Sequence, residues 1–313
     1  MTGHVIAVGG ANLDTLARVT GDPDDPRPVL GTSNPGRTSH TAGGVARNVA
    51  ENLARLGTPV RLVAAVGDDA VGDTLLADLA DLGVDVSGVR RRALPTGSYT
   101  AVLDHRGELV VGVADMAATE SLAPSDLPDD AFAGAGWVVL DGNLVPATVD
   151  RCLALAASAG VPVALDPVGV AKAARLQVTG RVHTFTPTRE ELAAFTGTAE
   201  VAAAVAIAHD RGIDTVWLRE GAGGSTIHRR GTAPVRVQLA GAAVVDVTGA
   251  GDAMLAGYVH RMLAGSPVVE AARFGAAAAW LTVASSYTVR TDLTAELVAE
   301  TLARLDPTRE GAR

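Results

Sequence analysis

Short hydrophobic runs alternate with amphipathic helical patterns along most of the chain, and this alternation restricts the fold more than any other feature. Runs rich in β-branched residues have the length of buried strands at 4–10, 60–67, 137–143, 162–167, 182–187 and 214–221. Helical patterns lie between them, and two of these end at Gly57 and Gly83. The alternation predicts an α/β fold with a mainly parallel sheet that binds ligands at the carboxyl ends of its strands.

One segment breaks this alternation. Residues 84–113 contain about three short strands separated by Gly/Pro turns and no helical pattern, so we expect a small β appendage there. Whether residues 14–40 form a further part of the same appendage stays open. Since the 313 residues show no internal repeat and no low-complexity linker, we expect a single domain over 1–313 with this appendage inserted.

Charge and composition argue against two classes of function. The formal net charge is −9, aromatic residues make up 3%, and no Lys/Arg cluster is present, so a nucleic-acid groove is not expected. The most apolar region, 268–284, contains Glu270 and Arg273 at helical spacing, which fits a core helix better than a membrane span. We therefore expect no nucleic-acid or membrane partner, and a small-molecule substrate.

The single cysteine, Cys152, lies in an apolar helical stretch and cannot form an internal disulfide. A buried thiol in a reducing compartment is the simplest interpretation. The chain also opens on a strand-like run instead of a basic and apolar leader. We expect the protein to be cytoplasmic.

The strongest candidate site is the glycine-rich stretch DVTGAGDAMLAG, which starts at Asp246. After Thr248, three successive backbone N–H groups would lie at a helix N-terminus, where the dipole and the unpaired donors attract phosphate. These N–H groups belong to Gly249, Ala250 and Gly251. By itself, Asp252 fits two roles: a helix-terminal carboxylate, or a general base that takes the proton of a hydroxyl attacking a bound phosphoryl group.

Two weaker polar motifs lie upstream. Asn12 and Asp14 follow the first strand, and an amide and a carboxylate at this spacing suit two vicinal hydroxyls, although such residues also form turns. Gly43 and Gly44 open a helix on which Asn48 lies off the apolar face, where it can reach into a cleft or cap the helix structurally. Their position at strand ends favours a shared cleft with the glycine-rich turn.

In this order, these motifs resemble the ribokinase-like (PfkB) family of carbohydrate kinases over essentially the whole chain. The resemblance implies a three-layer α/β/α domain with a small β lid, which transfers phosphate from ATP to an alcohol. It also implies that Asp252 is the general base and that the 249–251 amides form the anion hole. Asn12 and Asp14 would hold sugar hydroxyls, with the help of Gly43, Gly44 and Asn48.

Within the family, the chain is most similar to pseudouridine kinases, through Ser33 and Asn34 in TSNPG and through the pair Asp115 and Met116. This similarity implies phosphorylation of the 5′-hydroxyl of pseudouridine. The lid residues that would cover the ribose or contact the base are Ser98, Tyr99, Asp115 and Met116. Because family members often pair through such lids, we expect a homodimer. Another PfkB sugar or nucleoside kinase, and a catalytically silent sugar- or nucleoside-binding protein, stay open as alternatives.

The nucleotide side departs from the family pattern. Where relatives usually have Lys-Pro-Asn followed by Glu, this chain keeps Glu191, which the resemblance links to Mg²⁺ through water, but has Thr188 in place of the amide. The loop REGAGGST has Gly223 where an acidic or polar residue is common. The resemblance places near the ATP Thr186, Thr188, Arg219, Gly221, Gly223, Gly224 and Thr248. It also implies a monovalent-cation site near Asp246, which leaves K⁺ dependence open.

Overall fold

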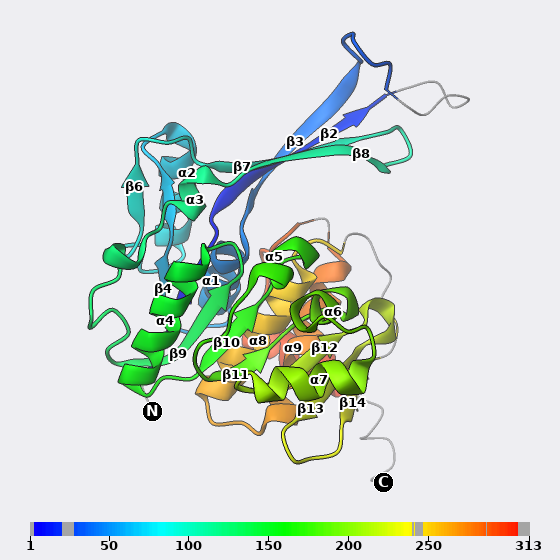
Figure 1. Cartoon of the computed structure of the whole chain (residues 1–313). Helices are drawn as coiled ribbons and strands as arrows, with labels where there is room; N and C mark the ends of the chain where they lie inside the picture. The colour runs from blue at the N-terminus through cyan, green and yellow to red at the C-terminus, as the bar shows by residue number, and fades with distance from the viewer. Residues whose placement is uncertain (1–2, 21–27, 240, 242–246, 286, 306–313) are drawn as a thin grey trace.

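A central sheet of eight strands forms the core of the computed structural model, which describes residues 3–20, 28–239, 241, 247–285 and 287–305 (Figure 1). The strand order is β14-β13-β12-β11-β10-β9-β1-β4, and the strands from β12 to β4 run parallel. The parallel strands are β1 (His4–Val8), β4 (Val60–Val63), β9 (Ala135–Asp141), β10 (Val163–Asp166), β11 (Val182–Phe185) and β12 (Ile213–Arg219). At one edge, β13 (Ser225–Arg229) and β14 (Val235–Val237) run antiparallel.

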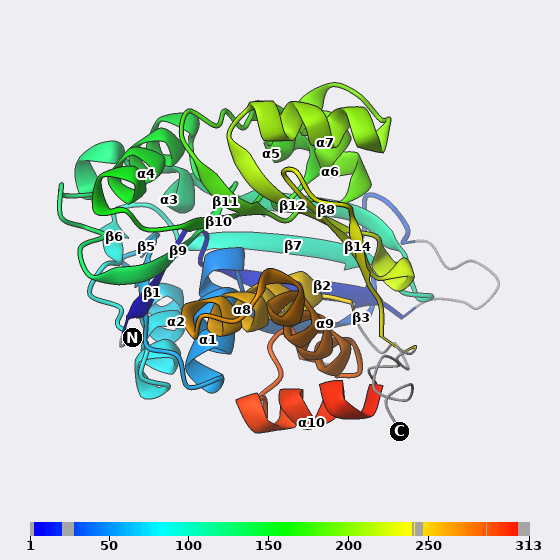
Figure 2. The same cartoon turned by 90° about the horizontal axis from the view of Figure 1, so that it is seen from below.

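Helices cover both faces of this sheet, as Figure 2 shows from below. One face carries α1 (Val45–Arg55), α8 (Ala250–Leu263) and α9 (Val268–Val283), and α10 (Ala295–Leu305) packs on α9. The other face carries α4 (Pro146–Ala159), α5 (Val170–Arg175), α6 (Arg189–Thr196) and α7 (Val201–Asp210). Each layer buries its own hydrophobic cluster, for example Leu53 and Val259 on the first face and Leu153 and Phe195 on the second. The predicted three-layer α/β/α fold is confirmed.

A second sheet of four strands projects from this body (Figure 1). Its order is β3-β2-β7-β8, with the bounds β2 (Asn12–Val19), β3 (Gly36–Gly43), β7 (Gly97–Leu103) and β8 (Leu109–Asp115). Half of the sheet thus comes from residues 12–43, which include the segment 14–40 that the sequence pattern left open. The strand β6 (Arg90–Arg92) pairs instead with β5 (Ala65–Gly67), beside which α2 (Ala70–Asp81) and α3 (Ala117–Glu120) lie.

Two further expectations concern Cys152 and the apolar region at 268–284. Cys152 is buried, as predicted, and burial raises the pKa of its thiol to about 12. Within the described residues, no single helix is both long and apolar enough to cross a bilayer, and α6 and α7 meet those criteria only as a joined pair that bends by 55°. The apolar region at 268–284 forms α9, which packs against α8 and α10.

Candidate active site

Asp141 anchors the carboxyl edge of the central sheet. Its side chain is fully buried at the end of β9, and its Oδ2 accepts hydrogen bonds from the backbone N–H groups of Gly10 (2.8 Å) and Ala46 (2.9 Å). Its Oδ1 accepts one from the N–H of Asn143 at 2.9 Å. One carboxylate thus fixes the loop after β1, the start of α1 and the end of β9. The sequence pattern missed this role, because a strand-terminal aspartate looks the same whether it anchors or reacts.

Asp252 lies in the first turn of α8, where it meets α1. Its side-chain Oδ2 accepts a hydrogen bond of 2.8 Å from Nδ2 of Asn48, a residue 204 positions away in the sequence. Asp252 is buried, with 9% of its surface exposed. Burial raises its pKa to about 8, and Asp166 and Asp141 add to the rise, whereas Asn48 and Arg219 oppose it. A carboxylate with this pKa is suited to accept a proton near neutral pH.

The glycine-rich turn precedes Asp252 directly. Gly249 caps α8 with a φ of 76°, and a Cβ at this position would lie 1.9 Å from the carbonyl oxygen of Thr288. Only glycine fits there. The N–H groups of the first helical turn have no partners within the helix, although that of Ala250 donates to the carbonyl of Val247 at 3.3 Å, so this N-terminus can receive an anion beside Asp252. Thr248, just before the turn, is exposed, whereas Asp246 and most of the strand expected before it lie outside the described residues.

Arg219, the last residue of β12, brings a positive charge to this turn. Its guanidinium forms ion pairs of 3.1 Å with Asp166 at the end of β10 and with Glu191 on α6. A Cβ on Gly251 would lie 2.5 Å from Nη1 of Arg219, so the guanidinium lies against the turn itself. Thr186 donates a hydrogen bond of 3.0 Å from its hydroxyl to Asp166 and completes the cluster. The sequence pattern did not single out Asp166.

Thr188 and Glu191 form a capping box at the start of α6. The hydroxyl of Thr188 accepts a hydrogen bond from the N–H of Glu191 at 3.2 Å, and Oε2 of Glu191 accepts one from the N–H of Thr188 at 2.7 Å. The threonine that replaces the family amide is therefore the N-cap of a helix. Because Oε2 of Glu191 also contacts Arg219, a metal-bound water would have to use Oε1. The described residues contain no cluster of three or more His, Cys, Asp or Glu side chains that could hold a metal.

The predicted hydroxyl-binding residues lie together where the second sheet leaves the body. Asn12 donates a hydrogen bond of 2.7 Å from Nδ2 to Oδ1 of Asp14. A Cβ on Gly43 would lie 2.3 Å from Oδ2 of Asp14, so the carboxylate packs on that glycine. Gly44, with a φ of 94°, allows the same close approach between the start of α1 and the carbonyl of Gly10. Burial raises the pKa of Asp14.

The remaining lid residues divide into two groups. Ser98 and Tyr99 pair with Leu13 and Asp14 along β2, and Asp115 pairs with Ser98 and is followed by Met116. These residues border the hydroxyl-binding group.

Ser33 and Asn34 lie at the opposite end of the second sheet, just before Gly36, which pairs with Val19. Val19 is seven positions after Asn12 along β2, a distance of about 23 Å at the usual rise of a strand. The side chain of Asn34 closes its own loop through hydrogen bonds to the backbone of Val29 and Thr32. Within one chain, the structure does not bring these two residues to the site, contrary to the expectation from the sequence.

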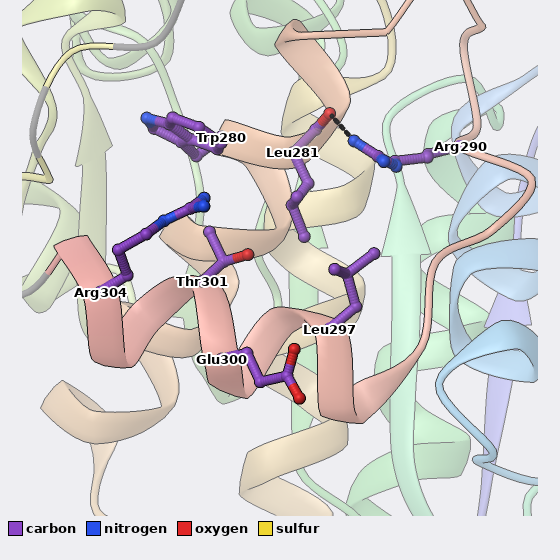
Figure 3. A pocket seen from close by; sticks show the side chains of 7 residues that line it. All are labelled: Trp280, Leu281, Arg290, Leu297, Glu300, Thr301 and Arg304. Carbon is purple, nitrogen blue, oxygen red and sulfur yellow. Dashed lines mark hydrogen bonds between the residues drawn. The ribbon is translucent and has the colours of Figure 1, made fainter.

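On the nucleotide side, the predicted glycines Gly221 and Gly223 lie in a short 3-10 turn that is separated from Arg219 by Glu220, and Gly224 follows with a φ of 88°. A separate cavity of about 490 Å³ lies between α9 and α10. It is lined by Trp280, Leu281, Arg290, Leu297, Glu300, Thr301 and Arg304 (Figure 3). None of the predicted site residues within the described part of the chain lines this cavity.

Comparisons with known proteins agree with this geometry. The family model described as "pfkB family carbohydrate kinase" matches residues 4–295. The pseudouridine kinase of Escherichia coli is 32% identical over 306 residues, which cover 93% of each chain. The ribokinase of Arabidopsis thaliana is 32% identical over 294 residues, 89% of this chain and 76% of the relative. A structure of Arabidopsis thaliana ribokinase complexed with ribose and ATP superposes with a TM-score of 0.83 at 28% identity, and covers 96% of this chain and 99% of that one. The chain belongs to the PfkB family of carbohydrate kinases and is a phosphotransferase with the ribokinase-like fold.

Proposed function

We propose that the protein transfers the terminal phosphoryl group of ATP to the 5′-hydroxyl of pseudouridine. The observation that carries the proposal is the buried Asp252, held by Asn48 at the glycine-rich turn of α8. The similarity to a pseudouridine kinase over 93% of both chains supports the choice of nucleoside. Because a ribokinase is equally identical to this chain, the experiment has to distinguish pseudouridine from a free sugar as the acceptor.

The proposed chemistry assigns each side of the site one task. Asn12 and Asp14 would hold the ribose hydroxyls and bring the 5′-hydroxyl to Asp252, which takes its proton as the oxygen attacks the phosphorus. Asn48 occupies Oδ2 of Asp252, which leaves Oδ1 for that proton. The amides of Gly249, Ala250 and Gly251 would stabilise the charge that develops on the transferred group.

Mg²⁺ would arrive with ATP and neutralise phosphate charge. Mg²⁺ usually keeps several waters and needs only one or two carboxylates in addition to phosphates, so Glu191 is a sufficient protein contact through Oε1 and a water. The hydroxyl oxygen of Thr188 accepts a hydrogen bond from the backbone of Glu191, and its proton can still be donated to such a water. Arg219, fixed by Asp166 and Glu191, would contact the phosphates from the other side.

A panel of acceptors tests the proposal. Purified protein with ATP and Mg²⁺ is incubated separately with pseudouridine, uridine, adenosine, ribose and fructose, ADP release is measured, and the product is identified by NMR. We expect pseudouridine 5′-phosphate and a much slower reaction with uridine, whose base is linked through nitrogen. Efficient turnover of uridine, adenosine or a free sugar without turnover of pseudouridine would assign another PfkB kinase activity instead. The absence of ADP release above background with every acceptor would favour a catalytically silent binding protein.

We further propose that the protein is a homodimer that pairs through the second sheet. The strand β8 forms an edge of this sheet, and it leaves four large apolar side chains exposed by 43–63%: Leu109, Val110, Val111 and Val113. An exposed apolar edge strand is a common surface for pairing with another chain. A second copy of the sheet would cover these residues and would extend the lid over the neighbouring site.

A further inference from the structure

Helix α1 carries a row of three charged side chains, two of which are buried and need an explanation. Arg47, Glu51 and Arg55 follow one another at intervals of four residues, and the side chains of Arg47 and Glu51 are only 6% and 7% exposed. Glu51 forms an ion pair with Arg47 and another with Arg55, the latter at 2.7 Å. Taking an arginine out of water is costly, and Nε of Arg47 is buried with no hydrogen-bond partner among the residues that the structure describes. The pair with Glu51 alone does not explain why Arg47 lies this deep.

A second contact of Arg47 leads to the reaction centre. Its Nη1 donates a hydrogen bond of 3.0 Å to Oδ1 of Asn48, and Nδ2 of the same amide donates to Asp252 at 2.8 Å. A guanidinium has only donors, so it can bind only the oxygen of the amide. The amide nitrogen must then face Asp252. The backbone of both residues is also held, because the N–H of Arg47 donates to the carbonyl of Gly10 and that of Asn48 donates to the carbonyl of Gly44. These bonds fix the start of α1, whereas the orientation of the Asn48 amide depends on its side-chain partners.

We propose that Arg47 is a positioning residue, which locks the amide of Asn48 with its nitrogen toward Asp252. The inference rests on the proposed role of Asp252 as the general base. Without Arg47, the amide of Asn48 is free to turn over and to present its oxygen to the carboxylate. Two acceptors would then face each other, and the ionised form of Asp252 would lose a hydrogen bond.

The other charged groups around Asp252 belong to different elements. Asp141 ends β9, Asp166 ends β10 and Arg219 ends β12, and each influences Asp252 through its charge. A substitution of Arg47 leaves these three residues in place. Its effect should therefore appear as an upward shift of the pKa of Asp252, which reports the lost hydrogen bond from Asn48.

Arg47→Lys is the main test, with Arg47→Met as a second variant and Arg55→Met as the matched control. Lysine keeps a positive charge next to Glu51 and near Asp14, where burial raises the pKa and the charge of Arg47 opposes that rise. It lacks the forked guanidinium that contacts Glu51 and Asn48 together. Arg55 binds the same glutamate and has no hydrogen bond to Asn48 among those described. The pKa of Asp252 is followed in ligand-free protein by NMR of ¹³C-labelled aspartate, with Asp252→Asn to assign the signal.

We expect Arg47→Lys and Arg47→Met to raise the pKa of Asp252 by about one unit, the value of one hydrogen bond to a charged group. At pH 7, kcat should fall about tenfold and recover toward the parent value above pH 9, while KM for the nucleoside changes less than about threefold. Arg55→Met should keep the parent midpoint even if its melting temperature falls.

Two results would overturn the proposal. One is a folded Arg47→Lys protein in which Asp252 titrates as in the parent. The other is an equal shift in Arg55→Met, because the ion pairs of Glu51 would then account for the effect. The NMR titration needs no substrate, so failure of the proposed kinase activity in the parent protein would be recognised separately from failure of this proposal.

Discussion

The carboxyl edge of the central sheet and the four-stranded second sheet differ in how completely they are packed. At the carboxyl edge, polar side chains are buried and partnered: Asp141 binds three backbone amides, Asp166 binds Arg219 and Thr186, and Asp252 binds Asn48. In the second sheet, all seven residues of β8 are exposed, four of them large and apolar.

This difference indicates that the two regions have different tasks: the carboxyl edge would perform the reaction, and the second sheet would bind a substrate or a partner. The groups that would move a proton and hold a phosphate are fixed by the protein before any ligand arrives, which is how preorganised sites stabilise developing charge. The second sheet has an unsatisfied apolar surface that a substrate, a partner or both would have to cover. We therefore expect substitutions at the carboxyl edge to change kcat, and substitutions in the second sheet to change association and KM.

The largest effect should follow from Asp252→Asn. The amide keeps the shape of the carboxylate and can still contact Asn48, but it cannot accept the proton of the attacking hydroxyl. We expect kcat to fall by about 10³-fold or more while nucleoside and ATP still bind, as measured by steady-state kinetics and calorimetry. A kcat near that of the parent would remove Asp252 from the role of base.

Arg219→Met should have the next largest effect. It removes the guanidinium that lies against Gly251, so we expect kcat to fall by about 10²-fold, and affinity for ADP with aluminium fluoride to fall more than affinity for ADP alone. The control is Arg181→Met, which removes an exposed arginine paired with Asp214 near the start of β11. Equal losses for both nucleotide complexes would instead assign Arg219 a structural role.

A double substitution of Val111→Lys and Val113→Lys tests the second sheet. It places charges on the exposed face of β8, and we expect the mass measured by light scattering to change from that of two chains to that of one. The body of the protein should stay folded. Val235→Lys is the control, because Val235 is also a partly exposed valine on an edge strand, but of the central sheet. A parent protein that is already monomeric, or a double variant that stays dimeric, would reject pairing through β8.

The smallest expected effect concerns stability. The pKa of Asp252 is about 8 in the folded protein, against 3.8 for an aspartate in the unfolded chain. As the pH rises, the unfolded chain therefore releases this proton before the folded protein does. The stability contributed by the protonated carboxyl is complete below pH 3.8 and is lost as the pH rises toward 8. Asp252→Asn should therefore melt above the parent, by a margin that widens from pH 5 to pH 8 and then levels off. A difference in melting temperature that does not change with pH would contradict a raised pKa for the buried carboxyl of Asp252.

The strands, the layers and the glycine-rich turn could be predicted from the sequence, because buried parallel strands and helix ends have recognisable local patterns. The interpretation that Asn48 reaches the same cleft as Asp252 agrees with their hydrogen bond. Asp141, Asp166 and Arg47 were missed, since their roles depend on contacts between distant elements. Within one chain, Ser33 and Asn34 lie away from the site for a related reason: the pairing of β2 with β3 decides which end of the sheet they occupy.

The role of Asp252 as the base can be measured through the pH dependence of kcat/KM in the parent protein. If the buried Asp252 is the base, the rate rises tenfold per pH unit on the acid side and levels off above a midpoint near pH 8, and the residual activity of Asp252→Asn lacks this limb. A rate that is constant from pH 6 to pH 9, or the same limb in Asp252→Asn, would contradict the account.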